Sequence, residues 1–265
     1  MPPDNFSKSY PRIISRSNRD RQGWDNALHH ADDLVSASAT VRDAVVLFDT
    51  RKQLDTPALV RLMGLHHART LRAGGPIALR PYLPMRCETI RSLGHLPQPT
   101  LIIACWADMK MLDFVDGLAN VAGVVVIPLY EDSADDWETR WSPYIAGREA
   151  TAEPAPLITD RTVEQALLAL TKEVNLAEGL AIRYAREEAE TTLRILRVFG
   201  HSQDPARIKN WAIRHGWRPR DAVALADMAK RILEQKTKPK QGAGSNPQRR
   251  YARWVAAAQS RFQDM

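Results

Sequence analysis

The stretch from Thr100 to Tyr130 constrains the fold of this chain more than any other part of the sequence. It begins with a continuous apolar run over residues 101–107 and ends with a second one over 121–129. Between the two runs, Asp108 opens a segment in which apolar residues recur at helical spacing. Continuous apolar strands on either side of an amphipathic helix are typical of a parallel strand–helix–strand unit whose strands are buried on both faces. The sequence therefore predicts an open α/β sheet in this half of the chain.

Two earlier segments extend the same alternation. A candidate strand over 44–48 precedes a helix that starts at Thr56 and Pro57, which are favourable residues for a helix start. A short candidate strand over 77–79 precedes a short helix predicted over 86–93. This order predicts an α/β domain, doubly wound, with a mostly parallel sheet of about four strands.

Proline, glycine and charge indicate where the predicted domains end. Pro154 and Pro156 prevent regular structure in the segment before the helical half, and Lys, Gly, Pro and Gln dominate 236–250. The expected segments are a flexible arm at 1–23, the α/β domain at 24–147, a linker at 148–159, a smaller basic all-α domain at 160–235, a flexible basic linker at 236–250, and a terminal amphipathic helix at 251–265.

The sequence indicates the cellular compartment through its lack of a membrane-spanning run, its lack of a secretory signal, and its two cysteines. No apolar run approaches the roughly 20 residues that span a bilayer, and the N-terminal residues lack the apolar core of a secretory signal. Cys87 and Cys105 are the only cysteines and do not have metal-site spacing. We expect a cytoplasmic protein without disulfides and without a membrane partner.

Positive charge is concentrated in the second half of the chain. Residues 1–160 carry 17 Lys and Arg against 20 Asp and Glu, whereas residues 161–265 carry 20 against 11. Within 207–253 the count is 13 against 3. Nucleic acid is the partner that we expect for a basic surface of this kind. The alternatives are an acidic protein partner and charges that only solvate a helical surface.

The basic half also contains tryptophans that bear on how nucleic acid would bind. Trp211 shares a helical face with Ile208 and Ala212 and is expected in the core, whereas a tryptophan in the following turn could stack on a base. The residues expected to contact nucleic acid are Arg207, Lys209, Arg214, Trp217, Arg218, Arg220, Lys230, Arg231, Arg249, Arg250 and Arg253. The predicted function is nucleic-acid binding, with DNA as the expected target, in a regulator or mobile-element accessory protein whose α/β half senses a ligand or mediates assembly.

Residues 208–217 resemble, over this segment alone, the helix before the DNA-binding loop of actinobacterial xenogeneic-silencer nucleoid proteins. In that family an Arg-Gly-Arg loop enters an AT-rich minor groove. The resemblance implies that Arg218, Pro219 and Arg220 form the corresponding loop, with proline in place of glycine and with a shorter loop. It concerns about ten residues and carries no information about the α/β half.

A different class of function is suggested by acidic residues that follow three predicted strands. If those strands are neighbours, the carboxylates would meet at one edge of the sheet and hold Mg²⁺ for phosphodiester cleavage. The catalytic candidates are Asp49, Asp108 and Asp132, and the candidate metal ligands are Asp49, Asp108, Glu131 and Asp132. The alternative function is therefore a metal-dependent nuclease or phosphoesterase, and Mg²⁺ is the cofactor only in that case. Simpler roles also fit, because Asp108 suits a helix cap and Asp49 suits a turn.

A third class of function is an adaptor subunit of a larger protein assembly. The terminal helix places four large apolar side chains on one stripe, which could bind a protein partner. These residues are Tyr251, Trp254, Val255 and Phe262. Glycine-rich phosphate loops and the nucleophile elbow of hydrolases are absent from the sequence, so no nucleotide cofactor is predicted.

Overall fold

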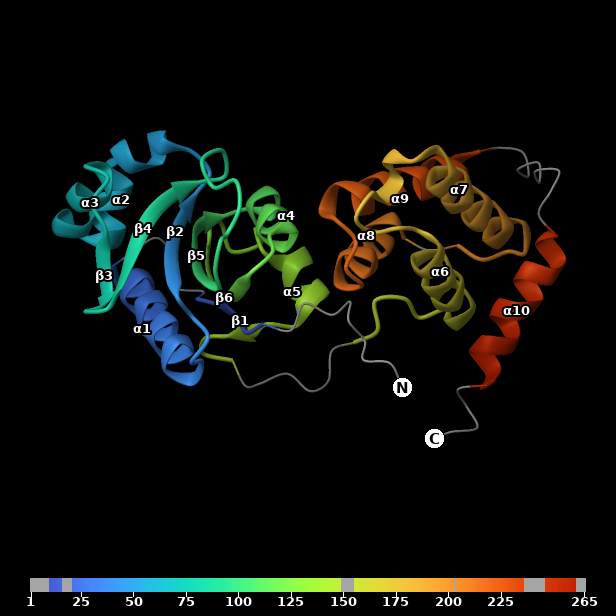
Figure 1. Cartoon of the computed structure of the whole chain (residues 1–265), viewed down its shortest axis with the longest axis horizontal. Helices are drawn as coiled ribbons and strands as arrows, with labels where there is room; N and C mark the ends of the chain where they lie inside the picture. The colour runs from blue at the N-terminus through green and yellow to red at the C-terminus, as the bar shows by residue number, and fades with distance from the viewer. Residues whose placement is uncertain (1–9, 16–20, 149–154, 203, 236–245, 261–265) are drawn as a thin grey trace. The chain divides into compact units, whose positions relative to one another are not determined.

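The computed structural model describes residues 10–15, 21–148, 155–202, 204–235 and 246–260. These residues fall into two compact units, 10–148 and 155–260. The first unit combines a sheet with helices, and the second is built from helices (Figure 1). In the described part of the chain no helix is both long enough and apolar enough to cross a membrane.

One sheet of seven strands organises the α/β unit, in the order β3-β4-β2-β5-β6-β1-β7. All neighbouring strands are parallel except β3 and β4, which form an antiparallel hairpin. The strands are β1 (Arg12–Ile14), β2 (Asp43–Phe48), β3 (Ile77–Arg80), β4 (Leu83–Thr89), β5 (Thr100–Ala107), β6 (Val121–Pro128) and β7 (Tyr144–Ile145). This arrangement confirms a mostly parallel α/β sheet.

Helices pack on both faces of the sheet, because successive side chains of a strand point to opposite faces. In β2, Val46 and Phe48 belong to one core, whereas Val45 and Leu47 belong to the other. The first core includes residues of α1 (Arg21–Ala37), the short 3₁₀ helix η1 (Arg51–Asp55), α2 (Pro57–Met63) and α3 (Leu65–Arg72). The second core includes residues of α4 (Met109–Gly117) and α5 (Asp135–Trp141).

The expected number of strands is wrong, since β1, β4 and β7 were not predicted. β4 replaces the helix predicted over 86–93, and its first residues alternate as a strand requires: Leu83 and Met85 are buried, whereas Pro84 is exposed. Pairing of Met85–Thr89 with β2 stabilises it. That partner is distant in the sequence, so local periodicity could not show it.

The predicted arm at 1–23 contains regular structure. Ile13 and Ile14 lie in β1 between β6 and β7 and are buried in opposite cores, and α1 already begins at Arg21. Residues 1–9 and 16–20 of the arm, 149–154 of the first linker and 236–245 of the second linker lie outside the described residues.

A buried ion pair joins the two helices of the second core. Asp116 and Arg140 are both fully buried, and Arg140 Nη1 donates to Asp116 Oδ2 at 2.6 Å. The indole nitrogens of Trp137 and Trp141 donate to the same carboxylate at 3.3 and 2.9 Å. Burial and the negative charge of Asp116 raise the pKa of Tyr10, whose hydroxyl lies 3.5 Å from Asp116 Oδ1. Trp137, Arg140 and Trp141, which follow β6, thus serve the fold.

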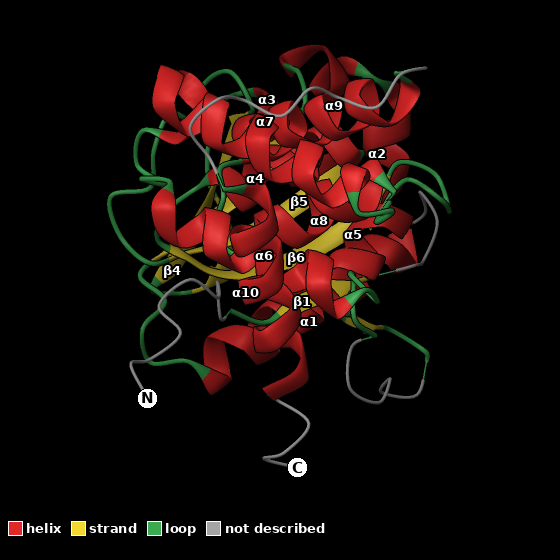
Figure 2. Cartoon of the chain, turned by 90° about the vertical axis from the view of Figure 1, so that its right-hand side faces the viewer, coloured by secondary structure: helices red, strands yellow, loops and turns green. Residues whose placement is uncertain are grey.

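The second unit is helical throughout its described residues (Figure 2). Its elements are α6 (Arg161–Glu173), the 3₁₀ turn η2 (Gly179–Ala181), α7 (Arg183–Val198), α8 (Pro205–Arg214), α9 (Pro219–Glu234) and α10 (Pro247–Ser260). α8 and α9 pack against each other, α7 packs on α9, and α10 packs mainly on α6. α10 begins at Pro247, four residues before the predicted start of the terminal helix.

Candidate functional site

The basic surface is built on α8, a four-residue turn and the start of α9. Asp204 begins α8, because its side chain accepts a hydrogen bond from Ala206 N at 3.0 Å. Gly216, at φ 86°, reverses the chain after the helix, a conformation that glycine adopts without strain. Pro219 then occupies the first position of α9, where its missing N–H costs nothing.

The two tryptophans of this segment are both core residues. Trp211 is 2% exposed, as its helical spacing predicts, and Trp217 is 1% exposed. The indole of Trp217 donates to Thr171 Oγ1 at 2.9 Å, and its backbone N–H donates to Ala212 O. The prediction that Trp217 stacks on a base is therefore wrong, because the reversal at Gly216 returns its ring to the core.

The arginines of the same segment remain on the surface. We define the α8 turn surface as Arg207, Arg214, Arg218 and Arg220. Three of the four are exposed and Arg214 is half-buried. Within residues 204–235, no ion pair joins the first three to a carboxylate, and Arg220 lies 3.9 Å from Asp221 with its own side chain 73% exposed. Residues 205–220 contain no Asp or Glu, so all charged side chains within this segment are basic.

The other residues of α8 and α9 that were predicted to contact nucleic acid are Lys209, Lys230 and Arg231. Lys209 is half-buried. Lys230 and Arg231 are exposed on α9, where they share a groove with Asp227 and Glu234. The local charge around these two side chains is therefore mixed.

On α10, Arg250 has a structural role instead of the predicted contact with nucleic acid. Its side chain is 14% exposed, and Nη1 lies 2.8 Å from Glu188 Oε2 while Nη2 donates to Thr192 Oγ1 at 3.2 Å. These contacts bind α10 to α7. Arg249 and Arg253 are exposed on the same helix.

The apolar stripe of α10 packs within the chain. Trp254 is 5% exposed and Val255 is half-buried, while the ring of Tyr251 stacks on Phe199 with centroids 3.9 Å apart. Because α10 packs on α6 and α7, the structure does not support the predicted use of these three residues for a protein partner. Phe262 lies outside the described residues.

The resemblance to xenogeneic-silencer proteins is not reflected in the local structure. Arg218 precedes α9, and Pro219 and Arg220 are its first two residues. No separate arginine loop projects from this part of the described chain. Proline in the position of the family's glycine explains the difference, because it favours the first turn of a helix.

The acidic candidates at the carboxyl edge of the sheet have other roles. Asp49 Oδ1 lies 2.7 Å from Lys110 Nζ. Asp108 caps α4 and accepts from Met111 N at 2.9 Å, and Glu131 and Asp132 are exposed after β6. Across the described residues, no group of three or more His, Cys, Asp and Glu side chains is placed to hold a metal ion. The structure therefore does not gather the ligands of the nuclease alternative.

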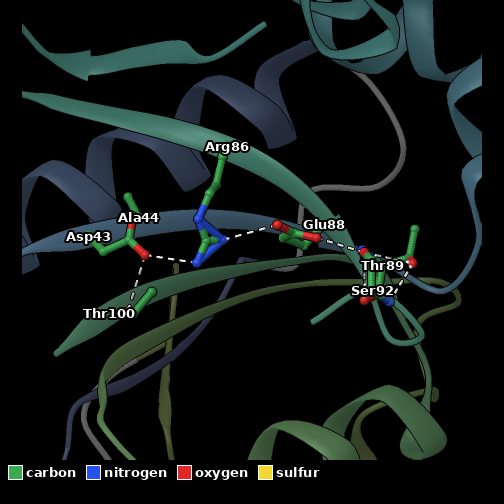
Figure 3. Close-up of polar contacts among 7 residues, drawn as sticks. All are labelled: Asp43, Ala44, Arg86, Glu88, Thr89, Ser92 and Thr100. Carbon is green, nitrogen blue, oxygen red and sulfur yellow. Dashed lines mark hydrogen bonds and ion pairs between the residues drawn. The ribbon is translucent and has the colours of Figure 1, made fainter. Parts of the chain in front are cut away.

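Sequence patterns did not indicate a polar cluster on β2 and β4 (Figure 3). Arg86 lies between two carboxylates, with Nη2 2.9 Å from Asp43 Oδ2 and Nη1 3.3 Å from Glu88 Oε1. Ser92 Oγ donates to Glu88 Oε2 at 2.6 Å, and Thr89 N donates to Ser92 Oγ. Every residue labelled in Figure 3 makes at least one polar contact with another, so the cluster holds the end of β4 in place. The helix predicted over 86–93 gives no reason to expect this cluster.

One residue at the carboxyl edge has an unusual backbone. Trp106, near the end of β5, has φ 54° at a shift in the pairing with β6. Its side chain is 7% exposed, and its indole nitrogen is buried without a hydrogen-bond partner. Strained residues of this kind concentrate at functional sites.

The nearby thiols are not nucleophiles at neutral pH, because burial raises the pKa of Cys87 to about 11 and raises that of Cys105 as well.

The fold and surface define an α/β unit joined in one chain to a basic helical unit. Residues 159–255 match the model of a family described as a domain of unknown function, DUF1889. This match covers α6–α9 and most of α10, and it leaves the α/β unit unmatched. Comparisons with curated proteins and with solved structures found no match.

Proposed function

We propose that this protein binds the phosphates of nucleic acid, with duplex DNA as the expected target, through the α8 turn surface. The observation that carries the proposal is the set of exposed arginines on an acid-free segment of sixteen residues, 205–220. Phosphate contacts supply most of the affinity of non-specific binding and need unpaired Lys or Arg side chains on a surface of one sign.

Rigid support of the arginines favours the same proposal. Trp211 and Trp217 fix the turn from the core side, and Gly216 sets its direction. Arginines on a fixed turn lose less conformational entropy on binding than arginines on a mobile tail. The turn is therefore a better binding surface than its charge alone would indicate.

The α/β unit has a second role in this proposal, which is to sense a ligand or to mediate assembly. Open sheets of this class bind ligands outside the carboxyl ends of their strands. The strained backbone and unpaired indole nitrogen of Trp106 lie at that edge. The nuclease alternative has less support, since Asp49 and Asp108 are already engaged with Lys110 and with the start of α4.

Fluorescence anisotropy with labelled duplex DNA, single-stranded DNA and RNA tests the proposal. Arg207→Ala and Arg218→Ala should each weaken binding with no change in melting temperature, because both side chains are exposed. The matched control is Arg183→Ala, which removes an exposed arginine whose charge Glu187 already compensates at 2.6 Å. Binding of DNA without its cleavage in the presence of Mg²⁺ fits a regulator. Wild-type protein that binds none of the three nucleic acids would refute the proposal.

A further inference from the structure

A groove runs along α9, where most of the α9 side chains that line it are exposed. It has a volume of about 900 Å³ and is lined by residues of η2, α7 and α9. Two contacts fix its walls: Leu180 N donates to Asp221 Oδ1 at 3.2 Å at one end, and Arg197 hydrogen-bonds to Gln235 O at the other. Because corresponding ends of α7 and α9 are joined, the two helices run side by side in the same direction.

The charges of this groove are balanced, unlike those of the α8 turn surface. Four basic and four acidic side chains line it. Asp227, Lys230, Arg231 and Glu234 are exposed, and none of these four forms an ion pair with any residue that the structure describes. A groove with equal numbers of both charges gives little attraction to a polyanion such as nucleic acid.

Balanced, unpaired charges on one helix face allow two copies of that face to bind each other across a two-fold axis. In such an interface the same patch meets itself, so each residue pairs with a different residue of the second copy and the reverse pair occurs as well. A surface of one sign repels its own copy, whereas a surface with both signs can be self-complementary. Ala224, which is exposed, and Val223, which is 39% exposed, add apolar area that such contact would bury.

We propose that the α7–α9 groove is a self-association surface whose occupant is α9 of a second copy of this chain. The two α9 helices lie antiparallel across a two-fold axis, with Asp227 of each copy opposite Lys230 of the other. Val223 of each copy enters the groove of the other. The contact is modest in size and rich in charge, so the dimer is in reversible equilibrium with the monomer. Arg207, Arg214 and Arg218 lie outside the groove and remain free for nucleic acid, whereas Arg220 lines the groove and belongs to both surfaces.

Sedimentation velocity on the full chain tests this assignment. The wild type should show a dimer whose fraction rises with protein concentration and falls between about 0.1 M and about 1 M salt, because salt screens the exposed pairs. Asp227→Lys and Lys230→Asp should each weaken association by about tenfold or more, since symmetry places two like-charge contacts in each variant dimer. An equimolar mixture of the two variants should dimerise again, because both contacts are then between opposite charges.

Arg207→Asp is the matched control, since it reverses an exposed charge on α8 outside the groove. It should leave self-association unchanged while it weakens nucleic-acid binding, and circular dichroism should show all variants folded. A wild type that is monomeric at every concentration, or a dimer that both α9 substitutions leave intact, would overturn the assignment. Neither result touches the proposed nucleic-acid binding, which rests on the α8 turn surface.

Discussion

The carboxylate of Asp116 stabilises the folded state of the α/β unit. It is fully buried with Arg140, and two indole nitrogens donate to it. Asp116→Asn should lower the free energy of unfolding by about 3–5 kcal/mol, because removing one partner leaves a buried charge less compensated. Chemical denaturation measures this change. Asp113→Asn is the control: Asp113 also pairs with Arg140, at 2.8 Å, but is 19% exposed, so a smaller loss is expected. Equal losses in the two variants would contradict this account of the cluster.

His67 makes stability depend on pH near neutrality. Trp24 Nε1 donates to His67 Nδ1 at 3.2 Å, which requires that nitrogen to be unprotonated. Partial burial lowers the pKa of His67 below its ordinary value of 6.5, and the positive charge of nearby His66 and Arg21 lowers it further. The unfolded chain therefore binds the proton more readily than the folded chain, and stability is lost as pH falls below 6.5.

The test of this pH dependence is a variant that keeps the acceptor and cannot titrate. His67→Asn places an amide oxygen where Nδ1 accepts, so its melting temperature should fall less than that of the wild type on acidification. The difference between the two curves isolates His67 from the other histidines. Parallel curves would show that protonation of His67 does not affect stability.

At the scale of elements, η2 depends on a glycine that nothing larger can replace. Gly179 has φ 63°, and a Cβ added there would lie 2.1 Å from Asp221 Oδ2. Gly179→Ala should lower the free energy of unfolding by about 2–4 kcal/mol, since strain of the left-handed backbone adds to the clash with α9. Gly200→Ala is the matched control, because Gly200 has φ 87° but no atom within 4 Å of the added Cβ. Thermal or chemical denaturation that ranks the two variants equally would contradict the close contact.

The elements that sequence predicted are those whose burial is visible locally. β5 and β6 are long, buried on both faces and joined by a helix, so their apolar runs identify them. β1 and β7 have three and two residues, too few for any period to be visible. β4 depends on pairing with β2, which precedes it by about forty residues.

The sequence predicts the positive charge of the α8 turn surface, but not which side chains around it are buried. The acid-free run over 205–220 can be read directly from the sequence, and its exposed arginines agree with that reading. The roles of Trp217 and Arg250 were not predictable, because their partners Thr171 and Glu188 lie 46 and 62 residues away in the chain. Long-range contacts decide whether a side chain faces solvent.

At the scale of the whole molecule, charge separates two kinds of surface. The first 160 residues carry a small excess of acid, and the remaining 105 carry nine more basic than acidic side chains, from 20 against 11. Under the proposed function, this distribution favours the helical unit as the part that binds nucleic acid. A large excess of one charge also attracts a polyanion over long distances at low salt.

The salt dependence of DNA affinity tests the central claim most directly. Each phosphate contact contributes about −0.9 to the slope of log affinity against log salt, so four arginine contacts predict a slope of about −3.6 for duplex DNA. Arg207→Ala and Arg218→Ala should each make that slope shallower by about 0.9, whereas Arg183→Ala should not change it. An affinity that does not vary with salt, or slopes that are the same in all four proteins, would contradict phosphate binding by the α8 turn surface.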